Sequence, residues 1–328
     1  MPDSEVVRLA KQQKARLLAR EADEMRNMTQ AWLKVEKSLE AEMLKIAVEM
    51  AASPNVTEAM ILRNRRFTSL LWQARAEYAR FSNGMEEHVG GLQEANTLLG
   101  VNDAYQVLQT GMDEANIAIN FNKLNTRAVD ISIGMAADGT PLKSLLDKSY
   151  GEATNGLLEK LTDGLAKGLN PVTIARNMAD GFGEPILQRA LVIARTETLR
   201  AYRMGSQEQY KESGIVTQYK RLATKDDRTC LGCLMEDGNV YETVDAFEEH
   251  PNGRCVLVPI IDGVTPPEWQ SGKDWLAGLP EDRQREIMGN ARFELYKNGT
   301  PLEDMSKHVD NAKWGGSFVP TPVSDLNK

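Results

Sequence analysis

The three cysteines of this 328-residue chain lie close together in the sequence, and one of its three histidines lies among them. Two residues separate Cys230 from Cys233, and Cys255 follows His250 by five positions. A Cys-x-x-Cys pair places two thiolates on one edge of a tetrahedron, and zinc prefers cysteine and histidine for its remaining ligands. The spacing therefore predicts a single zinc ion held by Cys230, Cys233, His250 and Cys255.

Four protein ligands close a zinc site, whereas a catalytic zinc keeps one position open for water. We therefore expect a structural zinc that supplies folding energy to a segment with few apolar residues. The Asp237-Gly238 turn between the ligand pairs suits a hairpin that folds the second pair onto the first. In the alternative interpretation, Cys230 and Cys233 are reduced and simply buried. A zinc-braced nuclease is disfavoured, because the segment holds no second histidine for a hydrolytic metal.

A second set of charged residues lies just before the cysteines. Arg195 and Glu197 begin a helical stretch, and in a transferase such a pair could grip a phosphate. A structural role is favoured, because an acid near a helix N-terminus interacts favourably with the dipole and an arginine can brace a carboxylate. Asp226 and Asp227 are expected to form a turn before Cys230, and Asp226 and Arg228 belong to the same structural motif.

Arginines and aromatic residues alternate between positions 61 and 80. Such a mixture can bind the phosphates and bases of DNA. A solvated helix face with ordinary core aromatics is the favoured alternative, and the net charge of −8 argues against gripping nucleic acid as the main task. The candidate DNA contacts are Arg63, Arg65, Arg66, Arg75 and Arg80.

The N-terminal half is predicted to be helical. Apolar residues recur at steps of three and four from Leu18 to Met50, which forms one stripe on a long helix that ends at Ser53-Pro54. This stripe either packs inside a helical bundle, which is favoured, or is covered by a partner ring or a second copy of the chain. A second helix begins at Thr57.

Glycines and prolines divide the following residues into shorter predicted helices. Gly84, Gly90-Gly91 and Gly100 indicate turns between helical pieces. Separate helices are expected at 173–178 and 185–213, the latter ending at Gly214. Beyond Gly214, residues 215–222 and 255–260 have the β-branched composition of strands. A polar helical tail follows Trp269, and the last residues are expected to be loosely held.

These patterns define a mainly α protein, with an elongated helical N-terminal half and a small zinc-stapled α+β module near the C-terminus. The predicted divisions are a helical docking region at 1–124, a helical domain at 125–214, the zinc module at 215–262 and a C-terminal helical tail at 263–328. The chain begins with mixed charged and apolar residues and holds no apolar run long enough to span a bilayer. Synthesis in a reducing cytoplasm follows as the default expectation, which favours metal binding over disulfides.

Residues 190–260 resemble the phage head morphogenesis family typified by the Mu F protein. The family hallmark is an R-T-E helix, a D-x-R-T-C-x-x-C segment, a D-G turn and an H-P-x-C-R-C ending. Here these elements are Ala194-Arg-Thr-Glu197, Asp226-Asp-Arg-Thr-Cys230 with Cys233, Asp237-Gly238 and His250-Pro-Asn-Gly-Arg-Cys255. Gly253 replaces the first cysteine of the ending, so Cys255 stands alone there. Weaker likeness extends upstream to 125–128, 138–139 and 168–181, and downstream to 275–289.

The resemblance implies a structural minor head protein of a tailed bacteriophage. It would lie in the virion, in the head interior or at the portal vertex, and act in head assembly or DNA delivery. Its implied partners are the portal protein or the major capsid protein, with packaged DNA or a second copy of the chain as further candidates. We expect no enzymatic activity; the alternatives are an enzyme acting on nucleic acid or NAD, and a DNA-contacting packaging factor.

Overall fold

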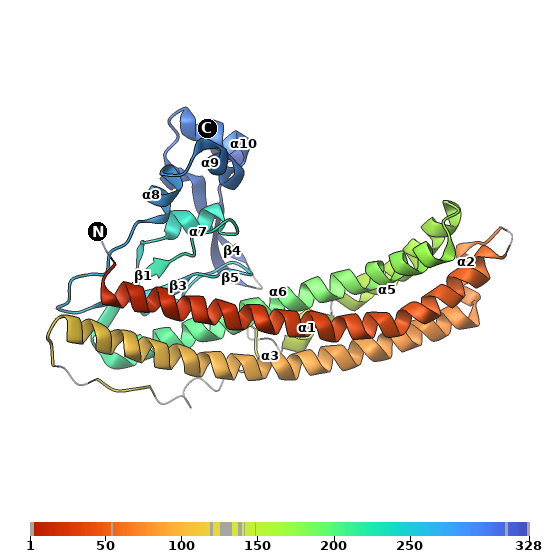
Figure 1. The fold of residues 1–328 in the computed structure, drawn as a ribbon, viewed down its shortest axis with the longest axis horizontal. Helices are drawn as coiled ribbons and strands as arrows, with labels where there is room; N and C mark the ends of the chain where they lie inside the picture. Colours follow the sequence, from red (N-terminus) through yellow and green to blue (C-terminus); the bar gives the residue numbers. More distant parts are fainter. Residues whose placement is uncertain are drawn as a thin grey trace. The chain divides into compact units, whose positions relative to one another are not determined.

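The computed structural model describes residues 3–53, 55–118, 121–124, 133–136, 140, 142–147, 149–311 and 314–326. Pro54 and residues 125–128 and 137–139, which carry predictions from the sequence, lie outside the described residues. Helices dominate the first 213 residues, and short strands appear only after them (Figure 1). The predicted fold class, a mainly α chain with a small strand-containing module near the C-terminus, is therefore confirmed.

Three long helices form most of the N-terminal half, together with shorter ones. The first ends close to the predicted break at residue 53. Among the described residues, no helix combines the length and the apolar character needed to cross a bilayer. The helices are α1 (Glu5–Ala51), α2 (Glu58–Arg63), α3 (Arg65–Glu114), α4 (Leu142–Asp147), α5 (Ser149–Ala166) and α6 (Pro171–Ser213).

The chain forms two compact units that share the three long helices. Unit 1 comprises 1–20, 91–139 and 196–328, and unit 2 comprises 21–90 and 140–195. Each unit is thus assembled from segments far apart in the sequence. The domain bounds expected from the sequence follow the chain linearly and stay a prediction.

The core of unit 2 contains the apolar stripe of α1. Trp32 is fully buried, with its ring centroid 4.7 Å from that of Phe81 on α3 and 6.0 Å from that of Phe182 on α6. The bundle interpretation is therefore correct for this stripe, and coverage by a partner is wrong for its central residues. Its buried residues in unit 2 are Met25, Met28, Trp32, Leu39, Met43, Ile46 and Met50.

The expected turns at glycines of α3 are wrong, because the helix continues through all of them. At Gly100 an added Cβ would lie 2.1 Å from the Tyr202 carbonyl oxygen of α6, so this glycine allows two helices of unit 1 to approach closely. The cost of a glycine inside a helix is roughly 1 kcal/mol. The break expected before Pro185 is also wrong, since α6 runs from Pro171 to Ser213 with Pro185 inside it.

A three-stranded antiparallel sheet in unit 1 has the order β2-β1-β3. The two strands expected from the sequence are present within one residue of their predicted bounds. One group of their side chains packs on α1, α3 and α6 through Val6, Leu17, Val107, Leu199 and Tyr202. The strands are β1 (Val216–Leu222), β2 (Val240–Glu242) and β3 (Val256–Ile261), with the short helix α7 (Leu231–Glu236) between β1 and β2.

Toward the C-terminus, unit 1 contains regular structure where the sequence predicts loosely held residues. An antiparallel hairpin pairs β4 (Ser306–Asn311) with β5 (Gly315–Pro320), and β5 packs against α7 (Figure 1). The contact is close, because a Cβ at Gly232 would lie 2.5 Å from the Phe318 carbonyl oxygen. The remaining elements are α8 (Gly272–Ala277), α9 (Glu281–Met288), α10 (Asn290–Lys297), the 3-10 helix η3 (Leu302–Met305) and α11 (Val323–Leu326).

Candidate metal centre

The first two cysteines lie at the N-terminus of α7. Cys230 is the N-cap residue, and its sulfur accepts a hydrogen bond from the backbone N–H of Cys233 at 3.3 Å. An N–H directed at a sulfur stabilises the thiolate, which is the form that binds metals. The local fold therefore aims both sulfurs toward one point.

His250 faces both of these sulfurs. Its Nε2 lies 3.2 Å from the Cys230 sulfur and 3.1 Å from the Cys233 sulfur. Its Nδ1 lies 2.8 Å from the carbonyl oxygen of Pro251. Because a carbonyl oxygen can only accept, Nδ1 carries the proton and Nε2 presents its lone pair to the cysteines. This is the tautomer that a metal ligand requires.

These three residues could hold a metal ion, since their ligand atoms lie within 4.8 Å of one another. In a tetrahedral zinc site a sulfur and a nitrogen ligand are about 3.5 Å apart, given Zn–S and Zn–N bonds of about 2.3 and 2.0 Å. The observed separations are slightly shorter, so the donor set fits zinc after a small expansion. Cys233 forms a second such group with Glu249 and Cys255. All four predicted ligands line one small cavity.

Hydrogen bonds between the thiols change their acidity. The Cys233 thiol donates to Cys230, which lowers the pKa of Cys230 and raises the pKa of Cys233. The Cys255 thiol donates to Cys233, and this bond together with burial raises the pKa of Cys255. The shifts thus make Cys230 the most acidic of the three thiols. Metal binding here would release protons.

A buried ion pair supports the cluster and was not anticipated from the sequence. Arg221 of β1 and Glu249 are each 2% exposed at the side chain, and their charged atoms are 2.9 Å apart. Burial alone would raise the pKa of Glu249, but the charges of Arg221 and Arg203 outweigh it and lower that pKa. Glu249 reaches the Cys233 sulfur at 3.5 Å and accepts from the Cys255 N–H at 3.3 Å. This carboxylate therefore joins both parts of the donor set.

Gly253, where the family pattern has a cysteine, leaves room for this carboxylate. An added Cβ at Gly253 would lie 2.1 Å from the carboxyl carbon of Glu249. Any larger residue at 253 would force Glu249 away from Cys233 and Cys255. The absence of a side chain at Gly253 thus leaves the space that the buried acid occupies.

Asp226 and Arg254 hold the two ligand-bearing segments together. The two nitrogens of Arg254 donate to the two carboxylate oxygens of Asp226 at 2.7 and 2.6 Å. This bidentate bond lowers the pKa of Asp226. Asp226 also accepts from the backbone N–H of Arg228, as expected for the predicted turn, while the Arg228 side chain is exposed beside the cysteine cavity. The Cys230 and Cys255 segments are therefore tied by a charged pair as well as by the cysteines.

Arg195 and Glu197 bond to different partners. In unit 2, Arg195 donates to Glu21 at 2.6 Å. In unit 1, the fully buried Glu197 accepts from Arg200 at 2.7 Å. Between them, the Thr196 hydroxyl accepts from the backbone N–H of Asn252 at 3.0 Å, which fixes the turn after His250. The motif thus anchors helix α6 and the second ligand segment.

The arginines between 63 and 80 have mixed environments within unit 2. Arg66 pairs with Glu49 at 3.1 Å, and Arg80 pairs with Glu77 at 3.0 Å. Arg75 lies 6.0 Å from the ring of Trp72, which is 66% exposed. Arg63 and Arg65 are exposed near the start of α3. Two of the five charges are thus partly neutralised, and among the other three Arg75 lies beside an exposed aromatic ring.

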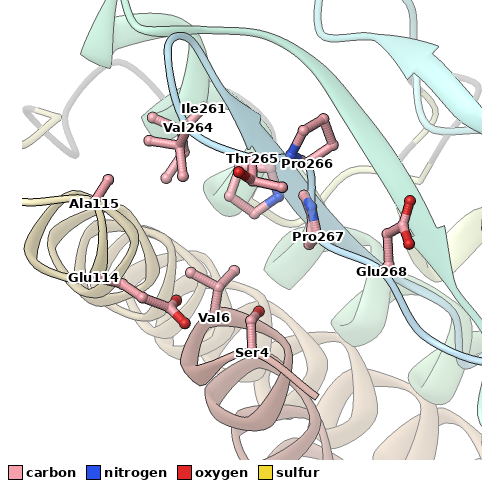
Figure 2. Close-up of a pocket in the computed structure, with 11 residues that line it drawn as sticks. Ser4, Val6, Glu114, Ala115, Ile261, Val264, Thr265, Pro266, Pro267 and Glu268 are labelled. Atoms are coloured by element: carbon pink, nitrogen blue, oxygen red, sulfur yellow. The ribbon is translucent and has the colours of Figure 1, made fainter. Parts of the chain in front are cut away.

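A separate cavity in unit 1 lies between the start of α1, the end of α3 and the loop after β3 (Figure 2). Its wall is mostly apolar, with Val6, Ile261, Val264 and Pro266 labelled around it. The carboxylate of Glu114 already accepts from the Glu5 backbone N–H. Its lining contains neither a nucleophile paired with a base nor a metal-ligand set. The cysteine cluster is therefore the better candidate for chemistry.

The geometry defines a chain of long helices with a cysteine and histidine cluster that could hold a metal. Residues 155–258 match the family described as Phage Mu protein F like protein, so the predicted resemblance is confirmed for this segment. The match indicates a phage head-related protein, and it includes Cys230, Cys233, His250 and Cys255. It also includes the weaker likeness at 168–181, but it does not reach those at 125–128, 138–139 and 275–289. Neither a curated protein nor a solved structure matches the chain significantly.

Proposed function

We propose that the chain is a structural, non-enzymatic minor head protein of a tailed bacteriophage that acts at the portal vertex and binds one structural zinc ion. The observation that carries this proposal is the overlap of the Mu F-like segment with the cysteine cluster. The nearby charged groups on which catalysis could depend are engaged in structural contacts. Asp226 bonds to Arg254, Glu197 to Arg200, and Glu249 to Arg221.

The zinc ion would have a folding role. Cys230, Cys233 and His250 would hold it, with Cys255 as the fourth ligand, and the bound ion would tie the loop before α7 to the segment before β3. Zinc has a preference for tetrahedral thiolate and imidazole ligands, and such sites contribute directly to folding. Glu249 would orient the site through Cys233 and the Cys255 N–H.

Exposed apolar side chains of unit 2 are the best candidates for docking on a head protein, since the stripe of α1 is buried. Leu33 and Val48 of α1 are about half exposed, as are Met60 and Leu62 of α2. Large exposed apolar residues are characteristic of protein interfaces when they gather. Truncation of α1 is an unsuitable test, because Val6 and Leu17 belong to the core of unit 1.

Point substitutions give a cleaner test of docking. The double variant Met60→Glu and Leu62→Glu should reduce incorporation into phage heads at least tenfold, while a double variant at exposed polar positions, Glu58→Lys and Thr68→Lys, should not. Quantitative mass spectrometry of purified particles measures the incorporation. Normal copy number in the Met60 and Leu62 variant would move the docking surface elsewhere in the chain.

DNA contact is a second candidate function, favoured by the exposed Trp72 beside Arg75. Aromatic side chains stack on single-stranded bases, and arginines contact phosphates. Binding of a fluorescent single-stranded oligonucleotide should weaken steeply with salt and fall about tenfold in Trp72→Ala, consistent with roughly 1–3 kcal/mol for a stacked base. A variant that unfolds would also lose binding, so thermal denaturation of Trp72→Ala serves as the control.

A further inference from the structure

A second group of metal-ligand residues lies in unit 1, outside the cysteine cluster. Glu248 follows β2, and His308 and Asp310 belong to β4. Their ligand atoms lie within 4.8 Å of one another, and His308 Nε2 is 2.8 Å from a carboxylate oxygen of Glu248. Residues two apart on a strand point to the same face, which explains why His308 and Asp310 lie together. Two separate segments thus bring one imidazole and two carboxylates to one point.

Gly316 makes this convergence possible. It pairs with Asp310 across the β4-β5 hairpin. An added Cβ at Gly316 would lie 2.2 Å from a carboxylate oxygen of Glu248 and 2.7 Å from His308 Nε2. Because Gly316 has no side chain, Glu248 and His308 meet in the space that a Cβ would fill. A residue other than glycine would separate them.

The group borders an open cavity rather than a packed interior. Glu248 and Gly316 line a cavity together with Thr196, Arg200 and Trp314. The side chains of Glu248 and His308 are 38% and 40% exposed. Water, or an anionic group attracted by Arg200, can therefore reach the point where the three ligands converge. Three protein ligands with solvent access leave coordination positions open.

We propose that Glu248, His308 and Asp310 form a second divalent cation site with nitrogen and oxygen ligands. One imidazole with two carboxylates suits manganese, iron or zinc, whereas magnesium and calcium prefer oxygen ligands alone. The site contains no sulfur, which separates its preference from that of the cysteine cluster. Glu248 and His250 are two residues apart, so one short segment contributes to both groups. The site does not depend on the proposed structural zinc.

Manganese binding to the full chain tests the site. Mn²⁺ is titrated into protein purified with its native metal content, and free Mn²⁺ is followed by electron paramagnetic resonance. The wild type should bind one equivalent, and His308→Ala and Asp310→Asn should each weaken binding at least tenfold. His88→Ala and Asp304→Asn, which change a histidine and an exposed acid elsewhere, are the matched controls and should bind as the wild type does.

Two further measurements separate loss of the cation site from loss of folding and from changes at the cysteine cluster. Circular dichroism and thermal denaturation verify that the variants fold, and the reactivity of the three cysteines reports separately on the cysteine cluster. Equal weakening in the control variants would mean nonspecific attraction of cations to an acidic surface and would overturn the proposal. Saturation of the wild type with Mn²⁺ at an affinity that His308→Ala does not change would overturn it as well. Reactive cysteines together with normal Mn²⁺ binding would contradict only the proposed structural zinc and would leave the second site supported.

Discussion

Unit 2 and the cysteine-bearing part of unit 1 have different interiors. In unit 2 the buried side chains are mainly apolar, with Trp32, Phe67 and Phe182 among the largest. Around the cysteines, the buried residues include Arg203, Arg221, Glu249 and Lys14. Apolar burial needs no specific partner and is insensitive to pH, whereas a buried charge is tolerated only when it is paired. We therefore expect metal removal and a change of pH to alter the stability of the cysteine-bearing part of unit 1 more than that of unit 2.

Loss of a metal ligand should have the largest effect. Cys233→Ser removes the sulfur shared by both donor groups, and zinc contributes on the order of 10 kcal/mol to the folding of small zinc domains. Residues 216–261 should lose protection in hydrogen exchange, while the amides of unit 2 stay protected. His250→Ala should behave alike, with His88→Ala as its control. Equal loss of protection in unit 2 would show that the two regions unfold as one.

Breaking the buried ion pair should have the next largest effect. Glu249→Gln leaves Arg221 buried beside Cys233 without its counter-charge, which should cost about 4 kcal/mol. The double variant Arg221→Met and Glu249→Leu should recover part of this loss, because no charge remains buried. Denaturant unfolding of the wild type, Arg221→Met, Glu249→Leu and the double variant gives the coupling energy. Additive losses in the double variant would mean that the pair does not act as a unit.

A substitution that removes apolar atoms from the core of unit 2 tests whether this region is independent of the zinc site. Leu39 is fully buried, and Leu39→Ala should cost about 3 kcal/mol through lost contacts and a cavity. Thermal unfolding measures the loss, and the zinc content of the folded protein should not change. The control is Leu33→Ala, at a half-exposed position on the same helix, which should cost well below 1 kcal/mol. A lower zinc content in Leu39→Ala would contradict the independence of the two regions.

The smallest expected effect is a pH dependence from Lys14. Burial lowers the pKa of Lys14 to about 8, where its ammonium group donates to the Leu222 carbonyl oxygen. Between pH 8 and about 10.4 the unfolded chain binds more protons than the folded one, so stability rises with pH through this window. From pH 7 to pH 9 the wild type should gain about 1 kcal/mol relative to Lys14→Met. Parallel stability profiles for the two proteins would contradict the shifted pKa.

Local patterns in the sequence predicted the elements that depend on local chemistry. The helical stripe before residue 53 and the strands after Gly214 follow from periodicity and composition. The spacing of Cys230 and Cys233 fits the N-terminus of α7, where the backbone itself directs the two sulfurs. Local patterns indicate these elements, although not how the strands pair, and the structure contains all of them.

Features that depend on long-range contacts were missed. Gly100 lies inside α3, where the absence of a side chain lets α6 approach closely, and no pattern around Gly100 reveals this. The role of Glu249 needs Arg221 from β1 and the absent side chain of Gly253. Residues 306–320 are too polar to indicate a hairpin, and their pairing depends on packing against α7. Arg254 stands next to Cys255, and this position was the only local feature of the sequence that indicated its bond to Asp226.

The central claim is that the cysteine cluster holds a structural zinc ion in the folded chain. Native mass spectrometry, after dialysis against a chelator that removes weakly bound cations, tests it most directly. We expect one zinc per chain, with Cys230, Cys233 and Cys255 unreactive toward a thiol reagent until the metal is stripped or the protein is unfolded. A folded, metal-free chain with all three thiols reacting at once would contradict it.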